Sequence, residues 1–177
     1  VKWAESGKFK ADLKKMFGSP PWVDLLAATP ECTQVSLANY RMRYKDPTVF
    51  RAMLRATAIV ASYLRTINPR LLSFRETPQT GRGKDQPEWI KEEKRLGATH
   101  IDYEACSGGA LWKKATRVDC SHQVVAAGLT DLLCDGKCAA IRTVGCHREC
   151  QSAPKVLKQQ IPENVTLYFI NAAKLFN

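Results

Sequence analysis

The spacing of hydrophobic and polar residues predicts a helix near the start of the chain. Apolar Phe9, Leu13, Met16 and Phe17 recur at the interval of one helical face, and lysines take most of the other positions. Gly18 is placed to end this helix. We expect a surface helix that packs its apolar stripe on the core, and the alternative is a basic helix that docks on a membrane or a partner.

The clearest helical pattern follows Asp46-Pro47, an N-cap residue before a first-turn proline, and ends at about Ile67, where Asn68-Pro69 stops it. Its apolar residues form one broad stripe, and arginines lie mostly on the opposite side. The stripe consists of Phe50, Met53, Leu54, Thr57, Val60, Ala61 and Leu64. We expect this helix to form the core of the first half of the chain.

Shorter patterns predict additional helices in the first half. Leu25 and Leu26 suggest a short helix before Thr29-Pro30, and residues 35–45 carry two interleaved apolar rows. The segment from Glu76 to Gln86 is rich in Pro, Gly, Thr and charged residues, which is typical of a linker.

A helix restarts after this linker. Asp85 and Glu88 have the spacing of a capping box, and Gly97 is placed to end the helix. From Ala98 onward, glycines interrupt short apolar segments, and a helix is suggested over His122–Leu133, although Gly128 weakens that prediction. Residues 165–170 could begin either a strand or a helix.

These elements together predict a mainly α-helical protein built in two parts. Residues 1–97 would form a basic helical region. Residues 98–177 would form a smaller, loop-rich region that is stapled by cysteines and ends in an apolar docking tail.

Six of the seven cysteines fall between Cys106 and Cys150, with the spacing C-x13-C-x13-C-x3-C-x7-C-x3-C, and Cys32 is left over. An even number of cysteines in a glycine-broken region favours disulfides, whose pairing the spacing does not determine. The predicted disulfide cysteines are Cys106, Cys120, Cys134, Cys138, Cys146 and Cys150.

A structural zinc site is the second interpretation of these cysteines, and unpaired buried thiols are the third. Four thiolates can bind zinc tetrahedrally in a closed site that is structural rather than catalytic. The predicted ligands are Cys134, Cys138, Cys146 and Cys150, with His147 or His122 as substitutes. Apart from this alternative, we expect no cofactor.

The twin C-x3-C spacing resembles that of small mitochondrial intermembrane-space proteins with paired cysteine motifs on a helical hairpin. The resemblance implies an oxidising compartment and no family membership, so we expect a mitochondrial location, with secretion as the alternative. The chain begins at Val1, which we interpret as the start of a processed mature protein. No apolar run reaches the roughly 18 residues that a membrane-spanning helix needs.

Positive charge is concentrated in the first half of the chain. The net charge is +10, and residues 1–95 hold 18 Lys and Arg against 10 Asp and Glu. A basic surface favours RNA, anionic lipid head groups or acidic protein partners. The predicted partner-binding residues are Arg41, Arg43, Lys45, Leu175 and Phe176.

The sequence contains no complete catalytic constellation. Cys146 and His147 are neighbours in sequence, whereas the Cys–His pair of a cysteine nucleophile is normally assembled by the fold from distant positions. We therefore predict a non-catalytic accessory or structural subunit of a larger, mitochondrial protein assembly. The alternatives are a secreted, disulfide-rich, toxin-like or effector-like protein and a zinc-stabilised RNA-binding subunit, for example of a ribosome.

Overall fold

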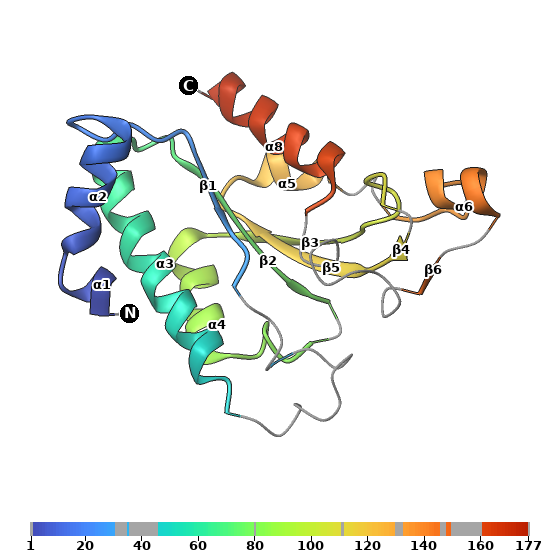
Figure 1. Cartoon of the computed structure of the whole chain (residues 1–177), viewed down its shortest axis with the longest axis horizontal. Coiled ribbons are helices and arrows are strands. Elements are labelled where there is room, and N and C mark those ends of the chain that lie inside the picture. Colours follow the sequence, from blue (N-terminus) through green and yellow to red (C-terminus); the bar gives the residue numbers. More distant parts are fainter. Residues whose placement is uncertain are drawn as a thin grey trace.

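A four-stranded mixed sheet forms the centre of the protein, in a computed structural model that describes residues 2–30, 35, 46–79, 81–110, 112–129, 133–145, 148–149 and 161–176 (Figure 1). In spatial order its strands are β1 (Leu25–Ala28), β2 (Leu72–Pro78), β5 (Ala115–Cys120) and β3 (Thr99–Glu104). β1 runs parallel to β2, whereas β5 runs antiparallel to both β2 and β3. A separate two-stranded parallel sheet pairs β4 (Trp112–Lys113) with β6 (Arg148–Glu149).

This sheet overturns the prediction of a mainly α-helical protein with a cysteine-stapled second part. β1 and β2 come from residues 1–97, β3 and β5 come from residues 98–177, and all four strands share one sheet. None of the described cysteines forms a disulfide; they are Cys106, Cys120, Cys134 and Cys138. Within the described residues of the second part, strand pairing and side-chain packing therefore take the place of the covalent staples that we expected.

Helices cover both faces of the sheet. Figure 1 shows α3 and α4 on one face and α5 and α8 on the other, with α2 packed on the outside of α3. The helices are α1 (Lys2–Glu5), α2 (Lys8–Phe17), α3 (Thr48–Ile67), α4 (Pro87–Leu96), α5 (Gln123–Ala127), α6 (Ala139–Val144) and α8 (Glu163–Phe176). The described chain thus forms a three-layer α/β/α arrangement, which buries both faces of the sheet.

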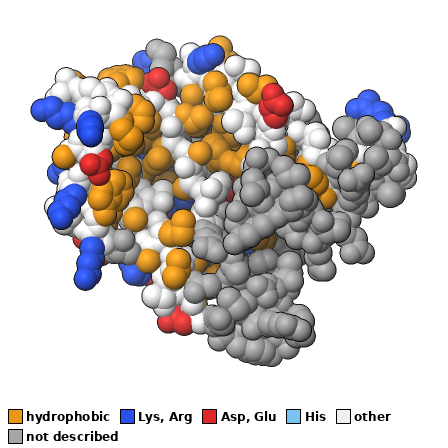
Figure 2. Space-filling view, viewed as in Figure 1, with side chains coloured by type: hydrophobic (Ala, Val, Ile, Leu, Met, Phe, Trp, Pro, Cys, Tyr) orange, Lys and Arg blue, Asp and Glu red, His pale blue; other side chains and the backbone are white. Residues whose placement is uncertain are grey.

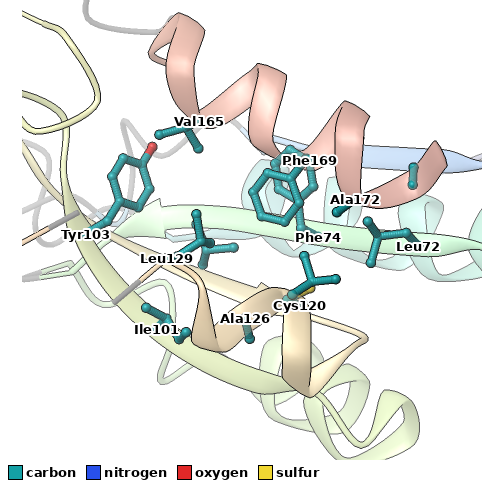
Figure 3. Close-up of a cluster of buried hydrophobic side chains, with 13 residues drawn as sticks. Leu72, Phe74, Ile101, Tyr103, Cys120, Ala126, Leu129, Val165, Phe169 and Ala172 are labelled. Carbon is teal, nitrogen blue, oxygen red and sulfur yellow. The ribbon is translucent and has the colours of Figure 1, made fainter. Parts of the chain in front are cut away.

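The sheet face beneath α5 and α8 is apolar. Alternate residues of the three longer strands point to it, because side chains alternate between the two faces of a strand. The Phe74 ring of β2 stacks on the Phe169 ring of α8, with 3.9 Å between centroids (Figure 3). The cluster is made of Leu72, Phe74, Ile101, Tyr103, Val118, Cys120, Val125, Ala126, Leu129, Val165, Phe169, Ala172 and Ala173.

The opposite sheet face, beneath α3 and α4, carries a buried ion pair. Arg75 Nη2 of β2 lies 2.6 Å from Asp119 Oδ2 of β5, and only 5% and 0% of these side chains are exposed. The Arg75 guanidinium also stacks on the Trp89 ring at 4.3 Å and donates a hydrogen bond to the Trp89 carbonyl oxygen at 3.3 Å. Burial raises the pKa of Asp119 to about 6, although the Arg75 charge opposes this shift.

Several helix predictions are confirmed. α2 buries Phe9 and Leu13 and ends at Gly18, and α3 and α4 occupy the predicted segments. Met16 and Phe17, however, are exposed, so the buried stripe of α2 is narrower than we expected.

Other local predictions are wrong. Leu25 and Leu26 lie in strand β1, where they pair with β2, rather than in a helix. The predicted linker is partly strand β2, and Gly83 within it is buried so tightly that an added Cβ would lie 2.9 Å from the Phe50 ring. The predicted helix at residues 35–45 lies outside the described residues, apart from Val35.

After residue 120, α5 is shorter than the helix that we predicted over His122–Leu133, and the segment at residues 165–170 belongs to a helix. α5 ends at Ala127, and it is followed by Gly128, where an added Cβ would meet the Tyr168 hydroxyl of α8. The segment that we could not assign to strand or helix is α8, which packs on the sheet through residues such as Val165 and Phe169.

No helix in the described part of the chain is both long enough and apolar enough to cross a membrane. This agrees with the absence of a predicted spanning segment.

We expect Arg75→Met to lower the free energy of unfolding by about 3–5 kcal/mol, because the change leaves the Asp119 carboxylate buried without its partner. Urea unfolding under fixed metal conditions measures this loss. The double variant Arg75→Met with Asp119→Leu removes both charges and should recover most of the stability. Arg55→Met, at a half-exposed pair with Glu88, serves as the control and should cost much less.

Candidate metal centre

Cys106 lies in a tight turn at the end of β3. The Gly109 amide donates to the Cys106 carbonyl oxygen at 3.2 Å, and Gly109 has a φ of 104°, which favours glycine. The Ala105 amide donates to the Lys114 carbonyl oxygen at 3.0 Å, just before β5 begins. The turn therefore fixes the Cys106 thiol beside the end of the central sheet.

Cys134 and Cys138 lie in a second loop that is anchored to the same end of the sheet. The Cys134 amide donates to the Glu104 carboxylate at 3.0 Å, and Glu104 is the last residue of β3. Within the loop, the Lys137 amide donates to Asp135 Oδ1 at 2.8 Å, and Gly136 has a φ of 82°. This turn brings the two cysteines of the C-x3-C motif back toward each other.

The three thiols converge on one point. The Sγ atoms of Cys106, Cys134 and Cys138 all lie within 4.8 Å of one another. Three thiolates around a tetrahedral zinc ion, with zinc–sulfur bonds of about 2.3 Å, would be about 3.8 Å apart. Small side-chain rotations therefore suffice to place the three sulfur atoms around one ion.

The surroundings of the thiols are apolar and largely closed to solvent. Cys106 is 0% exposed and Cys138 is 7% exposed, and they pack against Ala140 and Ile141 of α6. Burial, followed by the neighbouring thiols of Cys134 and Cys138, raises the pKa of Cys106 to about 12. Without a cation, this cluster favours protonated thiols, whereas a bound divalent ion would stabilise the thiolates.

The cysteines that the structure brings together differ from the predicted zinc ligands. Cys134 and Cys138 are two of the four predicted ligands, and they lie beside Cys106, which sequence reasoning left out because the spacing pattern groups only the paired motifs. The predicted ligands Cys146 and Cys150 and the substitute His147 lie outside the described residues.

Strand β6 brings a further part of the cysteine-rich segment to this end of the protein. β6 pairs with β4, which follows the turn that holds Cys106. Figure 1 shows β4, β6 and α6 together at one end of the molecule, away from α1 and α2. From the same segment, Ala140 and Ile141 of α6 pack against the thiols.

Cys120 is separate from this cluster. Cys120 is the last residue of β5. Cys106 follows Glu104, the β3 residue that pairs with Ala115 at the start of β5, so the length of β5 separates the two cysteines. Cys120 belongs to the apolar cluster under α5 and α8, and burial raises the pKa of its thiol to about 11. Cys106 and Cys120 therefore form no disulfide with each other, and Cys120 acts as a small core residue.

The predicted partner-binding residues are only partly described. Leu175 near the end of α8 is 87% exposed, which leaves it accessible to a partner. Arg41, Arg43, Lys45 and the Phe176 side chain lie outside what the structure describes. Of the histidines, His100 lies beside Glu93 at 3.2 Å on the surface, and His122 lies at the start of α5, outside the group formed by Cys106, Cys134 and Cys138.

Comparisons of the chain with protein-family models, with curated proteins and with solved structures find no match.

Zinc binding to the thiol cluster should weaken steeply as the pH falls. The ion must displace a proton from each thiol that it binds, and the raised pKa of Cys106 increases the proton competition. Affinity therefore rises with pH, by at most about a thousandfold per pH unit for three displaced protons. Competition with a chromophoric chelator between about pH 6 and about pH 8 measures this dependence, and an affinity that is independent of pH would contradict thiolate ligation.

Proposed function

We propose that this chain is a zinc-stabilised, non-catalytic subunit of a larger protein assembly. The observation that carries the proposal is the convergence of the Cys106, Cys134 and Cys138 thiols at the end of the central sheet. A zinc ion there would link the turn after β3 to the loop before α6, and so fix a segment that has few apolar contacts of its own.

A structural role for the ion fits the chemistry of this site better than a catalytic role. Catalytic zinc keeps an open coordination position that substrate can reach, whereas structural zinc is closed and rich in thiolates. Cys106 and Cys138 are buried, and Ala140 of α6 is 0% exposed beside them. Three thiolates also place three negative charges on the ion, which weakens its action as a Lewis acid.

Exposed apolar residues support a role as a subunit. Figure 2 shows hydrophobic side chains gathered on the face between α2 and α8. The exposed apolar residues on these two helices and on the segment between α2 and β1 include Met16, Phe17, Trp22, Leu167 and Leu175, which are between 46% and 87% exposed. Contiguous apolar surface on a soluble protein commonly marks a contact with another protein.

The mitochondrial location stays a prediction. Its basis was an oxidising compartment, and the four described cysteines form no disulfide, so they lend it no support. The secreted, disulfide-rich alternative depended on the same disulfides, and we do not carry it forward.

The zinc proposal predicts one zinc ion per chain. It also predicts that zinc binding weakens only when a cysteine of the cluster is replaced. Cys106→Ser, Cys134→Ser and Cys138→Ser should each weaken zinc binding by at least about tenfold and lower the melting temperature, because each removes one thiolate ligand. Native mass spectrometry and elemental analysis of the protein purified without added metal measure the stoichiometry.

Cys120→Ser is the matched control, because it removes a buried thiol outside the cluster. It should reduce stability without changing the zinc content. Metal-free native protein, or equal zinc loss in Cys120→Ser and Cys106→Ser, would contradict the proposed centre.

Binding to RNA is a second candidate function, and the lysines of the first two helices favour it. Lys2, Lys8, Lys10, Lys14 and Lys15 are all exposed. Within the described part of the chain these lysines form no ion pair. Lys10 contacts the Tyr63 ring, with 5.1 Å between Nζ and the ring centroid. Such a group of solvent-exposed ammonium groups can contact several phosphates of one strand.

The triple variant of Lys8, Lys14 and Lys15 to Gln should weaken binding to single-stranded RNA and flatten its salt dependence. The slope of log K against log salt should become shallower by about 0.7 for each phosphate that the variant no longer binds, since fewer counterions are released. Fluorescence anisotropy at several salt concentrations measures both effects.

A charge-matched control replaces Lys91, Lys94 and Lys174 with Gln on α4 and α8. Equal weakening in the control and in the α2 variant would indicate a general effect of net charge and would contradict an RNA surface on α2.

A further inference from the structure

A pocket lies at the end of the sheet opposite the thiol cluster, between the last turns of α3 and α4 and the point where β2 begins and β5 ends. Its volume is about 250 Å³. Arginines dominate its polar lining: Arg65 comes from α3, Arg70 precedes β2 and Arg95 comes from α4. Ser121 and His122, which follow β5, complete the polar part of the wall.

The charge in this pocket is positive. Among the described residues, its wall contains three guanidinium groups and no carboxylate. Glu92 lies beside the wall, and Arg95 already holds it with two nitrogens, at distances between 2.8 and 3.1 Å. Burial lowers the pKa of Arg65, the charge of Arg95 adds to this shift, and the charge of Glu92 opposes it.

Arg65 is the least compensated of these groups. Its Nη2 donates to Ser73 Oγ at 2.5 Å, whereas its Nη1 is buried and has no acceptor among the described residues. No carboxylate pairs with Arg65 within the same residues. A buried donor without an acceptor is costly, and an oxyanion in the pocket would lower this cost after a small movement of the guanidinium.

Two neighbouring groups are positioned by hydrogen bonds. Ser121 Oγ accepts from the Ser73 amide at 3.0 Å, which leaves the hydroxyl proton to be donated. Buried Asn68 accepts from the Arg70 amide at 2.9 Å and donates to the Val23 carbonyl oxygen at 3.1 Å. The backbone that carries Arg70 is therefore held by the core rather than by solvent contacts.

We propose that this pocket binds a phosphate group, as a free phosphate ion or as the terminal phosphate monoester of a small molecule. A phosphate monoester carries a charge of about −1.5 to −2 near neutral pH, which complements the excess of positive charge in the wall. Guanidinium forks and a hydroxyl donor are suited to its oxygens. The volume lies just below the roughly 300–1,000 Å³ of pockets for drug-sized ligands, so the pocket has room for a phosphate group and for part of the molecule that carries it.

Calorimetric titration of the purified full chain with inorganic phosphate, AMP and adenosine, at constant ionic strength, tests the site. Phosphate and AMP should bind, and adenosine should not, because it lacks the charged group. AMP binding much tighter than inorganic phosphate would identify a nucleotide-type ligand, whereas equal affinities would identify the phosphate alone. Equal binding of adenosine and AMP, or no binding of either phosphate compound, would overturn the proposal.

Arg70→Gln is the informative variant, because Arg70 is exposed and its replacement should leave the fold intact. It should weaken phosphate binding by at least about tenfold. Arg55→Gln on the same helix as Arg65, about 15 Å away along the axis, is the matched control and should bind as the parent does. Equal weakening in Arg55→Gln and Arg70→Gln would show a general charge effect and would also overturn the proposal.

Discussion

Arg75 of β2 and Asp119 of β5 form a buried ion pair that α4 covers. The pair links the two central strands to each other and to this helix. The pair fixes the register in which Arg75 faces Asp119 across the two central strands. The stacking of Arg75 on Trp89 ties the same point to α4. Two charges can remain buried there because each compensates the other and because the aromatic ring and a carbonyl oxygen contact the guanidinium.

This polar interior explains why the helices were predictable and the sheet was not. α3 has a broad apolar stripe between Asp46-Pro47 and Asn68-Pro69, so periodicity and end signals coincide. β2 is buried on both faces, and Arg75 and Thr77 lie on the buried face that carries the ion pair. Its polar residues therefore do not mark a solvent-exposed face, as they would in a half-buried strand. β1, at four residues, is too short for its pattern to be distinguished from a helix turn.

The thiol cluster shows a different limit of prediction. The spacing of Cys134 and Cys138 made their proximity predictable, because three intervening residues with Gly136 can form a turn. Cys106 could not be added to them, since only the pairing of β3 with β5 and the hydrogen bond from the Cys134 amide to Glu104 bring the loops together. Contacts between segments distant in sequence depend on the register of the sheet, which no local pattern contains.

β5 separates the thiol cluster from the arginine pocket, since its first residue, Ala115, lies at the end near Cys106 and its last residue, Cys120, lies beside Ser121 of the pocket. Six strand residues span about 20 Å. At that distance two unit charges interact by only about 0.8 kcal/mol at an effective dielectric constant of about 20, so direct electrostatic coupling is weak. Any coupling has to pass through the sheet itself, whose register the Arg75–Asp119 pair holds. A metal ion and an anion can thus bind at opposite ends of one rigid element, with each site dependent on the fold and not on the other's charge.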